Sequence, residues 1–319
     1  MKKLIEFGLL IILSLIPAIS GCGQTGEPTN DKIDIVCTVF PQYDWVRQIL
    51  GDKTDDVNLT LLLHNRIDLH NYQPSVDDIL KISGCDLFIY VGGESDKWID
   101  DALKQAANKN MVVINLLDIL GKSARKEEPI EGMAADGDGE IAYDEHIWLS
   151  LKNARIFCAS IENALSALDT GNAGEYKNNL TAYDKKLSAL DKEYKAAADA
   201  APVKTLLFGD RFPFRYLFED YGLDYYAAFP GCSAETEAGF DIIIYLANKT
   251  DELNLSAVMV TESADRSLAE TIISNTTAKN QQILVLDAIQ SVSFDDIKSG
   301  TTYLSVMENN LSVLKEALK

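Results

Sequence analysis

Apolar segments alternate with amphipathic ones along most of the chain, and this pattern predicts its secondary structure. Continuous apolar runs predict buried strands at 32–40, 57–63, 85–93, 111–120, 203–210, 223–229, 256–262 and 282–288. Segments with helical periodicity predict helices at 43–51, 76–83, 97–110, 146–168, 214–222, 238–253, 266–280 and 301–319. Alternating strands and helices are typical of parallel sheets covered by crossover helices, with ligands bound at the carboxyl ends of the strands.

One long helix is predicted between these two sets of strands, over residues 174–200. Its apolar residues are spaced 4, 3, 4, 3, 4 and 3 apart: Tyr176, Leu180, Tyr183, Leu187, Leu190, Tyr194 and Ala197. At 1.5 Å per residue the helix would be about 40 Å long. A coiled coil is the competing interpretation, but about three heptads are marginal for one. We therefore predict an α/β fold of two lobes, each a mainly parallel sheet with flanking helices, at 32–171 and 202–319, joined by a rigid linker helix at 172–201.

Residues 122–145 interrupt the alternation and contain eight acidic residues. A solvated surface loop is the simpler interpretation of this segment. The alternative is a weak cation-collecting segment that leads to His146.

The first 31 residues have the pattern of an export signal. Two lysines precede an apolar stretch, and small residues precede Cys22. The stretch is shorter than the roughly 20 residues of a membrane-spanning helix. It resembles a bacterial lipoprotein signal, which implies removal of residues 1–21, a lipid on Cys22, and a polar tether at 22–31. A plain secretory signal is the alternative.

Charge and cysteine content narrow the function further. The 319 residues carry 49 acidic against 29 basic side chains, a net charge of −20, which argues against a nucleic-acid partner. Four cysteines besides Cys22 have no CxxC or zinc-ribbon spacing, so we interpret them as core residues or one isolated bridge. They are Cys37, Cys85, Cys158 and Cys232.

Several short motifs occur in an order that resembles one protein family. DLHNYQPS at 68–75 and YDEHIWLSLKNA at 143–154 resemble the ligand-bearing segments of the zinc- and manganese-binding lipoproteins that serve metal-specific ABC importers, the ZnuA-like solute-binding proteins. FPQYDW, VGGESDKW, YLFEDYGL and GTTYLSVMENNL also match in order. The resemblance covers nearly the whole chain after the signal segment.

The resemblance implies a metal ion held between the lobes by four side chains. The first two ligand positions are His70 and His146, and neutral imidazole is a favoured ligand of zinc. The third position falls on Arg211, which has no lone pair to give, and the fourth falls on Gln290 or Ser291. The chain therefore departs from the family at half of the site.

Two outcomes follow from this departure. In the first, other carboxylates complete a Zn or Mn site, and Arg211 is paired with a carboxylate such as Glu235 or Glu237. In the second, Arg211 makes the cleft a site for an anion or an organic ligand. The candidate replacement ligands are Glu235, Glu237, Glu262 and Asp210. His64, six residues before His70, is interpreted as a loop residue or as one that orients a ligand.

Together these features predict a monomeric, lipid-anchored receptor on the extracytoplasmic face of a bacterial membrane. It would capture Zn or Mn, with no catalytic cofactor, and deliver the ion to an ABC permease and ATPase. An adhesin or interaction lipoprotein with a degenerate or repurposed site is the alternative. An enzyme has least support, because the sequence contains no GxSxG elbow, phosphate loop or dinucleotide motif.

Overall fold

The computed structural model describes residues 32–64, 66–133, 141–233 and 238–319. Lys32–Lys319 forms one compact unit. The predicted signal segment 1–21, the tether 22–31 with Cys22, part of the acidic segment 122–145, and both Glu235 and Glu237 lie outside the described residues.

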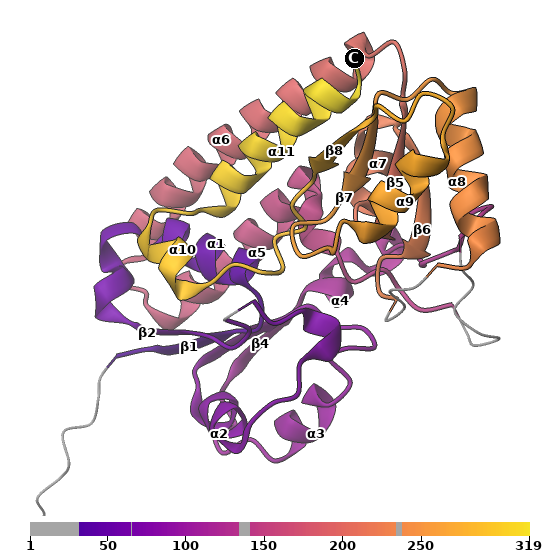
Figure 1. Cartoon of the computed structure of the whole chain (residues 1–319). Helices are drawn as coiled ribbons and strands as arrows, with labels where there is room; N and C mark the ends of the chain where they lie inside the picture. The colour runs from indigo at the N-terminus through magenta and orange to yellow at the C-terminus, as the bar shows by residue number, and fades with distance from the viewer. Residues whose placement is uncertain (1–31, 65, 134–140, 234–237) are drawn as a thin grey trace, which may run out of the picture. The chain divides into compact units, whose positions relative to one another are not determined.

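The first lobe is built on four parallel strands in the order β2-β1-β3-β4. The two central strands are almost entirely buried, because helices cover both faces of a parallel sheet. In Figure 1, α2 and α3 lie on one side of this sheet and α1 and α5 on the other. The strands are β1 (Asp34–Cys37), β2 (Asn58–Leu61), β3 (Leu87–Tyr90) and β4 (Val112–Asn115). The helices are α1 (Phe40–Leu50), α2 (Val76–Gly84), α3 (Ile99–Lys104), α4 (Leu116–Leu120) and α5 (Leu151–Leu168).

The predicted fourth strand, 111–120, is too long. β4 ends at Asn115, whose side chain accepts a hydrogen bond from the N–H of Asp118 and begins α4. An asparagine at the N-cap stabilises the start of a helix. The apolar residues on both sides of Asn115 gave no sign of this change from strand to helix. Short 3-10 helices fill the connections at Gly51–Asp56 (η1), Leu69–Asn71 (η2), Gly121–Ser123 (η3) and Ile147–Leu149 (η4).

The long helix α6 spans Ala173–Ala200. Five of the seven residues of its apolar stripe are buried, and Leu180 and Ala197 are partly buried against the same core. The stripe packs against α1, α5, α7 and α11 of the same chain, and α11 runs alongside α6 in Figure 1. The stripe is therefore covered within the molecule, which accounts for it without a coiled-coil partner.

The second lobe repeats the arrangement, with four parallel strands in the order β6-β5-β7-β8. Helices α8 and α9 pack on one side, whereas α7 and α11 contact α6. The strands are β5 (Thr205–Phe212), β6 (Asp224–Pro230), β7 (Ala257–Val260) and β8 (Gln282–Val285). The helices are α7 (Arg215–Tyr221), α8 (Phe240–Glu252), α9 (Ser267–Asn275), α10 (Phe294–Lys298) and α11 (Tyr303–Ala317).

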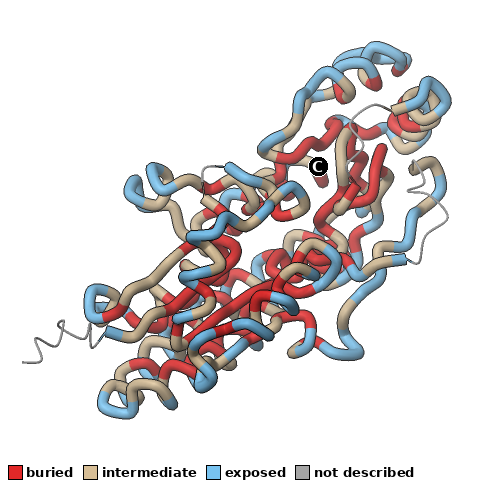
Figure 2. The backbone as a smooth tube through the Cα atoms, turned by 90° about the horizontal axis from the view of Figure 1, so that it is seen from below, coloured by how far each residue is buried: buried red, intermediate tan, exposed pale blue. Residues whose placement is uncertain are grey.

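One hydrophobic cluster runs continuously from the first sheet through α6 to β5 and β7 of the second lobe. Figure 2 shows the buried residues concentrated on the strands and inner helix faces. Hydrogen bonds also join the lobes, among them those from Trp148 Nε1 to the carbonyl of Ala288 (2.9 Å) and from the Tyr303 hydroxyl to the carbonyl of Trp148 (2.7 Å). The predicted fold class, two parallel sheets with flanking helices and a long joining helix, is confirmed. Within the described ranges, no helix is both long and apolar enough to span a membrane.

Candidate metal centre

His70 lies in η2, directly after the connection from β2. The Asp68 side chain caps this short helix by accepting the N–H of His70 at 2.9 Å, and Leu69 is buried beneath it. The imidazole Nδ1 lies 2.9 Å from the Ser95 hydroxyl and 3.5 Å from a carboxylate oxygen of Glu145. These contacts hold the ring by Nδ1 and leave Nε2 directed away from them.

His146 lies at the end of the acidic segment and is completely buried. One oxygen of Asp144 accepts both the backbone N–H and the ring Nδ1 of His146, each at 2.9 Å. Backbone pairing between Lys126 and Tyr143 joins the two ends of the acidic segment and so fixes this approach. A carboxylate that accepts Nδ1–H selects the tautomer whose Nε2 lone pair is free to bind a cation.

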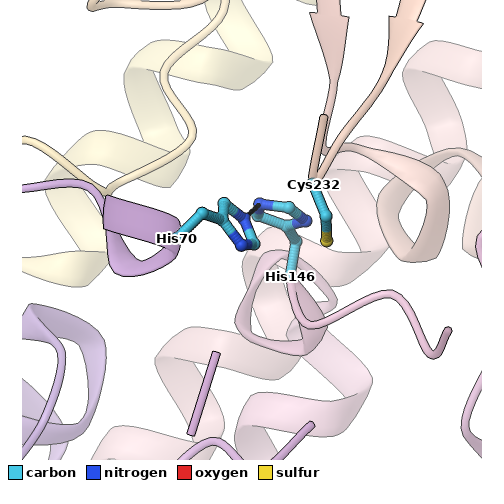
Figure 3. Close-up of side chains that lie close together, drawn as sticks. All are labelled: His70, His146 and Cys232. Carbon is cyan, nitrogen blue, oxygen red and sulfur yellow. Dashed lines mark hydrogen bonds between the residues drawn. The ribbon is translucent and has the colours of Figure 1, made fainter. Parts of the chain in front are cut away.

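The two imidazole rings approach each other through their Nε2 atoms, which lie 3.2 Å apart (Figure 3). With Zn–N bonds of about 2.0–2.1 Å, this spacing corresponds to an N–Zn–N angle of about 100°, close to tetrahedral. Two bare lone pairs at this distance repel unless a proton or a metal ion lies between them. The geometry therefore suits one cation, a proton or a metal ion, between the two nitrogens.

The protonation of the pair has a clear asymmetry. Burial, together with the neighbouring His146 ring, lowers the pKa of His70 to about 3. Burial also opposes protonation of His146, but the hydrogen bond and charge of Asp144 outweigh it and raise the pKa of His146 above its ordinary value. His70 is thus a neutral acceptor near neutral pH, as a metal ligand must be.

A third donor atom, on the second lobe, lies close to the two imidazoles. Cys232 follows the end of β6, and its Sγ and the two imidazole nitrogens all lie within 4.8 Å of one another. In Figure 3 the cysteine side chain extends from the strand ends towards His146. Among the residues that the structure describes, these three form the group of His, Cys, Asp and Glu side chains suited to hold a metal ion.

Comparison with known proteins agrees with this geometry. The family model "Zinc-uptake complex component A periplasmic" (ZnuA) matches residues 35–317. The chain belongs to the ZnuA family. It is 28% identical to the high-affinity zinc uptake system protein ZnuA of Bacillus subtilis strain 168, over 98% of this chain and 97% of that protein. It is also 28% identical to the zinc-binding lipoprotein AdcA of Streptococcus pneumoniae, over 96% of this chain but only 60% of AdcA.

Solved structures show the same ZnuA-family fold. The Zn(II)-bound ZnuA-like domain of S. pneumoniae AdcA has a TM-score of 0.70 and 28% identity, covering 90% of this chain and 99% of that one. The metal-dependent lipoprotein YcdH from B. subtilis has a TM-score of 0.72 and 26% identity, covering 90% of this chain and all of YcdH.

Arg211 occupies the third ligand position implied by the ZnuA family, and its guanidinium charge is paired with a carboxylate. Its guanidinium Nη2 lies 2.8 Å from a carboxylate oxygen of Asp68 in the first lobe. Burial raises the pKa of Asp68, but the charge of Arg211 and the hydrogen bonds from the Arg211 guanidinium and the backbone N–H of His70 outweigh it and hold the pKa below its ordinary value. Arg211 is therefore paired with a carboxylate, but this carboxylate is Asp68. Glu235 and Glu237, which the sequence suggested as partners, lie outside the described residues.

The other predicted replacement ligands are engaged elsewhere in this ZnuA-family chain. Asp210 accepts hydrogen bonds from the backbone and hydroxyl of Thr261. Glu262 accepts the N–H groups of Ala288 (2.8 Å) and Gln290 (3.1 Å) and the hydroxyl of Ser291. These carboxylates connect the ends of β5, β7 and β8, and neither belongs to the donor group around the histidines.

Three further residues complete the comparison with the sequence. The Gln290 side-chain oxygen is buried without a hydrogen-bond partner among the described residues. His64 packs its ring 4.9 Å from the ring of Phe294, away from the donor group. Cys232 was not predicted as a donor: a single cysteine has no spacing motif, and only its place two residues after the end of a strand pointed towards the ligand-binding edge of the sheet.

Proposed function

We propose that this chain is the lipid-anchored extracytoplasmic receptor of a metal importer, which captures a Zn or Mn ion between its lobes and delivers it to an ABC permease and ATPase. The observation that carries this proposal is the 3.2 Å approach of the His70 and His146 Nε2 atoms, each ring held by its other nitrogen. The names of the ZnuA and AdcA relatives, which describe zinc uptake and zinc binding, support the same role.

Capture of the ion requires no catalysis. The ion takes the position between the two Nε2 lone pairs and displaces any proton there, while Asp144 and Ser95 keep the rings oriented. The core that runs through α6 and both lobes favours small tilts and loop movements over wide hinge opening. We propose that the protein acts as a monomer, and that the segment before Lys32 exports it and attaches it to the membrane through Cys22.

The alternative of a repurposed anion or organic-ligand site gains no support from the side chains. Arg211 is the residue that would bind an anion, and Asp68 already neutralises it at 2.8 Å. The laminin-binding adhesin of Streptococcus agalactiae has a similar structure, with a TM-score of 0.72, but at 21% identity the likeness shows only the fold.

Metal titration tests the proposal. The purified protein is stripped with a chelator and titrated with Zn²⁺ and with Mn²⁺ in a competition assay. His70→Ala and His146→Ala should each lose tight binding, whereas His64→Ala, the matched histidine control outside the donor group, should bind like wild type. Equal, weak binding by all four proteins would overturn the receptor function.

Delivery needs a separate experiment. The ABC permease and ATPase that we expect to be encoded beside this protein would be reconstituted in proteoliposomes, and ATP hydrolysis would be measured with the metal-loaded receptor. Loaded wild type should stimulate hydrolysis, and the His70→Ala/His146→Ala double variant should not. Stimulation of equal size by both would mean that the permease does not respond to the metal at this site.

A further inference from the structure

We propose that Cys232 is the third metal ligand of this site, as a thiolate, and that it makes the receptor selective for Zn²⁺ over Mn²⁺. This inference rests on the proposed function, because it assigns the ligand set and the ion of the same site. It concerns a residue outside the two ligand segments that the sequence pointed to.

The position of the sulfur supports coordination. A tetrahedral zinc ion with Zn–N bonds of about 2.0–2.1 Å and a Zn–S bond of about 2.3 Å keeps its nitrogen and sulfur ligands about 3.6 Å apart. The Nε2 atoms of the two histidines already have a suitable spacing of 3.2 Å, and the sulfur lies within 4.8 Å of one ring nitrogen of each histidine. A change of the Cys232 side-chain rotamer that brings the sulfur towards the two Nε2 atoms would complete the geometry.

Two contacts fix the backbone around Cys232 and so determine where its side chain lies. Its N–H donates to a carboxylate oxygen of Glu127, in the acidic segment of the first lobe, at 2.8 Å. A Cβ on the preceding residue, Gly231, would lie 2.8 Å from the carbonyl oxygen of Phe212, so the close approach of these chains requires glycine. Both constraints place Cys232 at the carboxyl ends of β5 and β6, opposite the histidines.

The other side chains near His70 and His146 are not available as the third ligand. Asp144 and Glu145 contact the Nδ1 atoms, the reverse side of each ring from the ion. Arg211 offers no lone pair, and Asp210 and Glu262 are engaged by hydrogen bonds to strand ends. Within the described part of the chain, Cys232 is the donor that joins the two imidazoles.

The ligand chemistry sets the choice of ion. Thiolate and imidazole together suit Zn²⁺, which accepts a four-coordinate site, whereas Mn²⁺ prefers oxygen ligands and octahedral geometry. Two nitrogens and one sulfur leave one position for water or another oxygen. Replacing the sulfur with oxygen should therefore weaken zinc binding much more than manganese binding.

Cobalt spectroscopy and paired affinities test the inference. Co²⁺ bound by a thiolate gives an intense near-ultraviolet charge-transfer band, so the chelator-stripped protein would be titrated with Co²⁺, and Zn²⁺ and Mn²⁺ affinities measured by competition. Wild type should show the band, and Cys232→Ser should lack it. Cys232→Ser should also lose more than about 100-fold in zinc affinity, the upper end of what removal of an outer-shell partner costs, while its manganese affinity changes by only a few fold. Cys85→Ser is the matched control, since Cys85 is a buried free thiol in the first lobe, and it should behave like wild type.

The outcomes separate this inference from the proposed function. Tight, histidine-dependent binding without the charge-transfer band, and with equal zinc affinity in Cys232→Ser, would overturn the thiolate ligand and leave the receptor function intact. Absence of tight binding in wild type would overturn both. Alkylation of the wild-type protein provides a measurement that needs no variant: Zn²⁺ should protect Cys232 from iodoacetamide, as read by mass spectrometry, and unchanged modification of Cys232 would contradict the inference.

Discussion

Arg211 and Asp68 form an ion pair between the lobes, with Nη2 and Oδ2 at 2.8 Å and both side chains less than one fifth exposed. The other oxygen of Asp68 caps the short helix that carries His70. An arginine at a position where the ZnuA family implies a ligand thus helps to place His70, one of the two proposed histidine ligands. The positive charge is balanced beside the site rather than directed at the ion.

Arg211→Gln should lower the free energy of unfolding by about 1–3 kcal/mol, because it leaves the partly buried Asp68 carboxylate without its charged partner. Urea denaturation of the metal-free protein measures this. Arg155→Gln is the control, because the Arg155–Asp184 pair is 38% exposed on each side and should contribute less than about 1 kcal/mol. Equal effects of the two substitutions would contradict the role assigned to Arg211.

Asp144→Asn should reduce zinc affinity about 10–100-fold, because it removes the carboxylate that holds the Nδ1–H of His146. Competition titration with a zinc chelator measures the loss. Asp44→Asn is a matched control: Asp44 is an equally buried carboxylate, but it accepts the N–H of Tyr303. It should lower stability and leave zinc affinity unchanged. Unaltered affinity in Asp144→Asn would mean that the carboxylate does not orient the ligand.

The contribution of the buried Asp96 to the stability of the metal-free protein should fall as the pH rises from about 4 to about 7. Burial, with the charge of Glu145, raises the pKa of Asp96 to about 7, against the backbone N–H groups of Gly92 and Val91 that favour its charged form. Between these pH values the folded state binds a proton that the unfolded state has released, so the free energy of unfolding falls. Above about pH 7 both states are ionised at this residue and its contribution is constant.

Asp96→Asn should therefore remove this contribution, so that the difference in unfolding free energy between variant and wild type changes by an amount on the order of a few kcal/mol between pH 4 and pH 7. Urea denaturation of wild type and variant at several pH values measures the difference. Parallel curves for the two proteins would show that Asp96 does not titrate in this range.

Two tyrosines of α6 should respond in opposite ways to loss of the hydroxyl. The Tyr194 hydroxyl donates to the Met307 carbonyl of α11 at 2.6 Å, so Tyr194→Phe should destabilise the protein by about 0.5–1.5 kcal/mol. The Tyr183 hydroxyl is buried without a hydrogen-bond partner in the described structure, so Tyr183→Phe should be neutral or stabilising. Thermal unfolding measures the stability of both variants. A larger loss of stability in Tyr183→Phe than in Tyr194→Phe would contradict these contacts.

Much of the fold was predictable because apolar periodicity reports burial directly. The seven-residue stripe predicted α6 to within one residue of Ala173–Ala200. The predicted strand at 111–120 was too long, because a polar residue interrupts the apolar run. Asn115 ends β4 and caps α4, so the second half of the run is a helix. α10 was not predicted, because five residues, Phe294–Lys298, are too few to show helical periodicity.

The site was predictable only where it lies in motifs. His70 and His146 occur in segments that resemble the ZnuA-like proteins, and the structure brings their rings together. The Arg211–Asp68 pair joins residues 143 positions apart, and Cys232 reaches the imidazoles only when the second sheet packs beside the first. Such contacts follow from the tertiary fold, and no local sequence pattern encodes them.

The central claim is that one ion lies between the two imidazoles. A crystal structure of the zinc-loaded protein, with anomalous scattering recorded across the zinc absorption edge, measures this most directly. We expect a single strong zinc peak about 2.0–2.1 Å from the Nε2 atoms of both His70 and His146. A zinc peak bound to only one of these rings, or located elsewhere with the rings still in contact, would contradict the account.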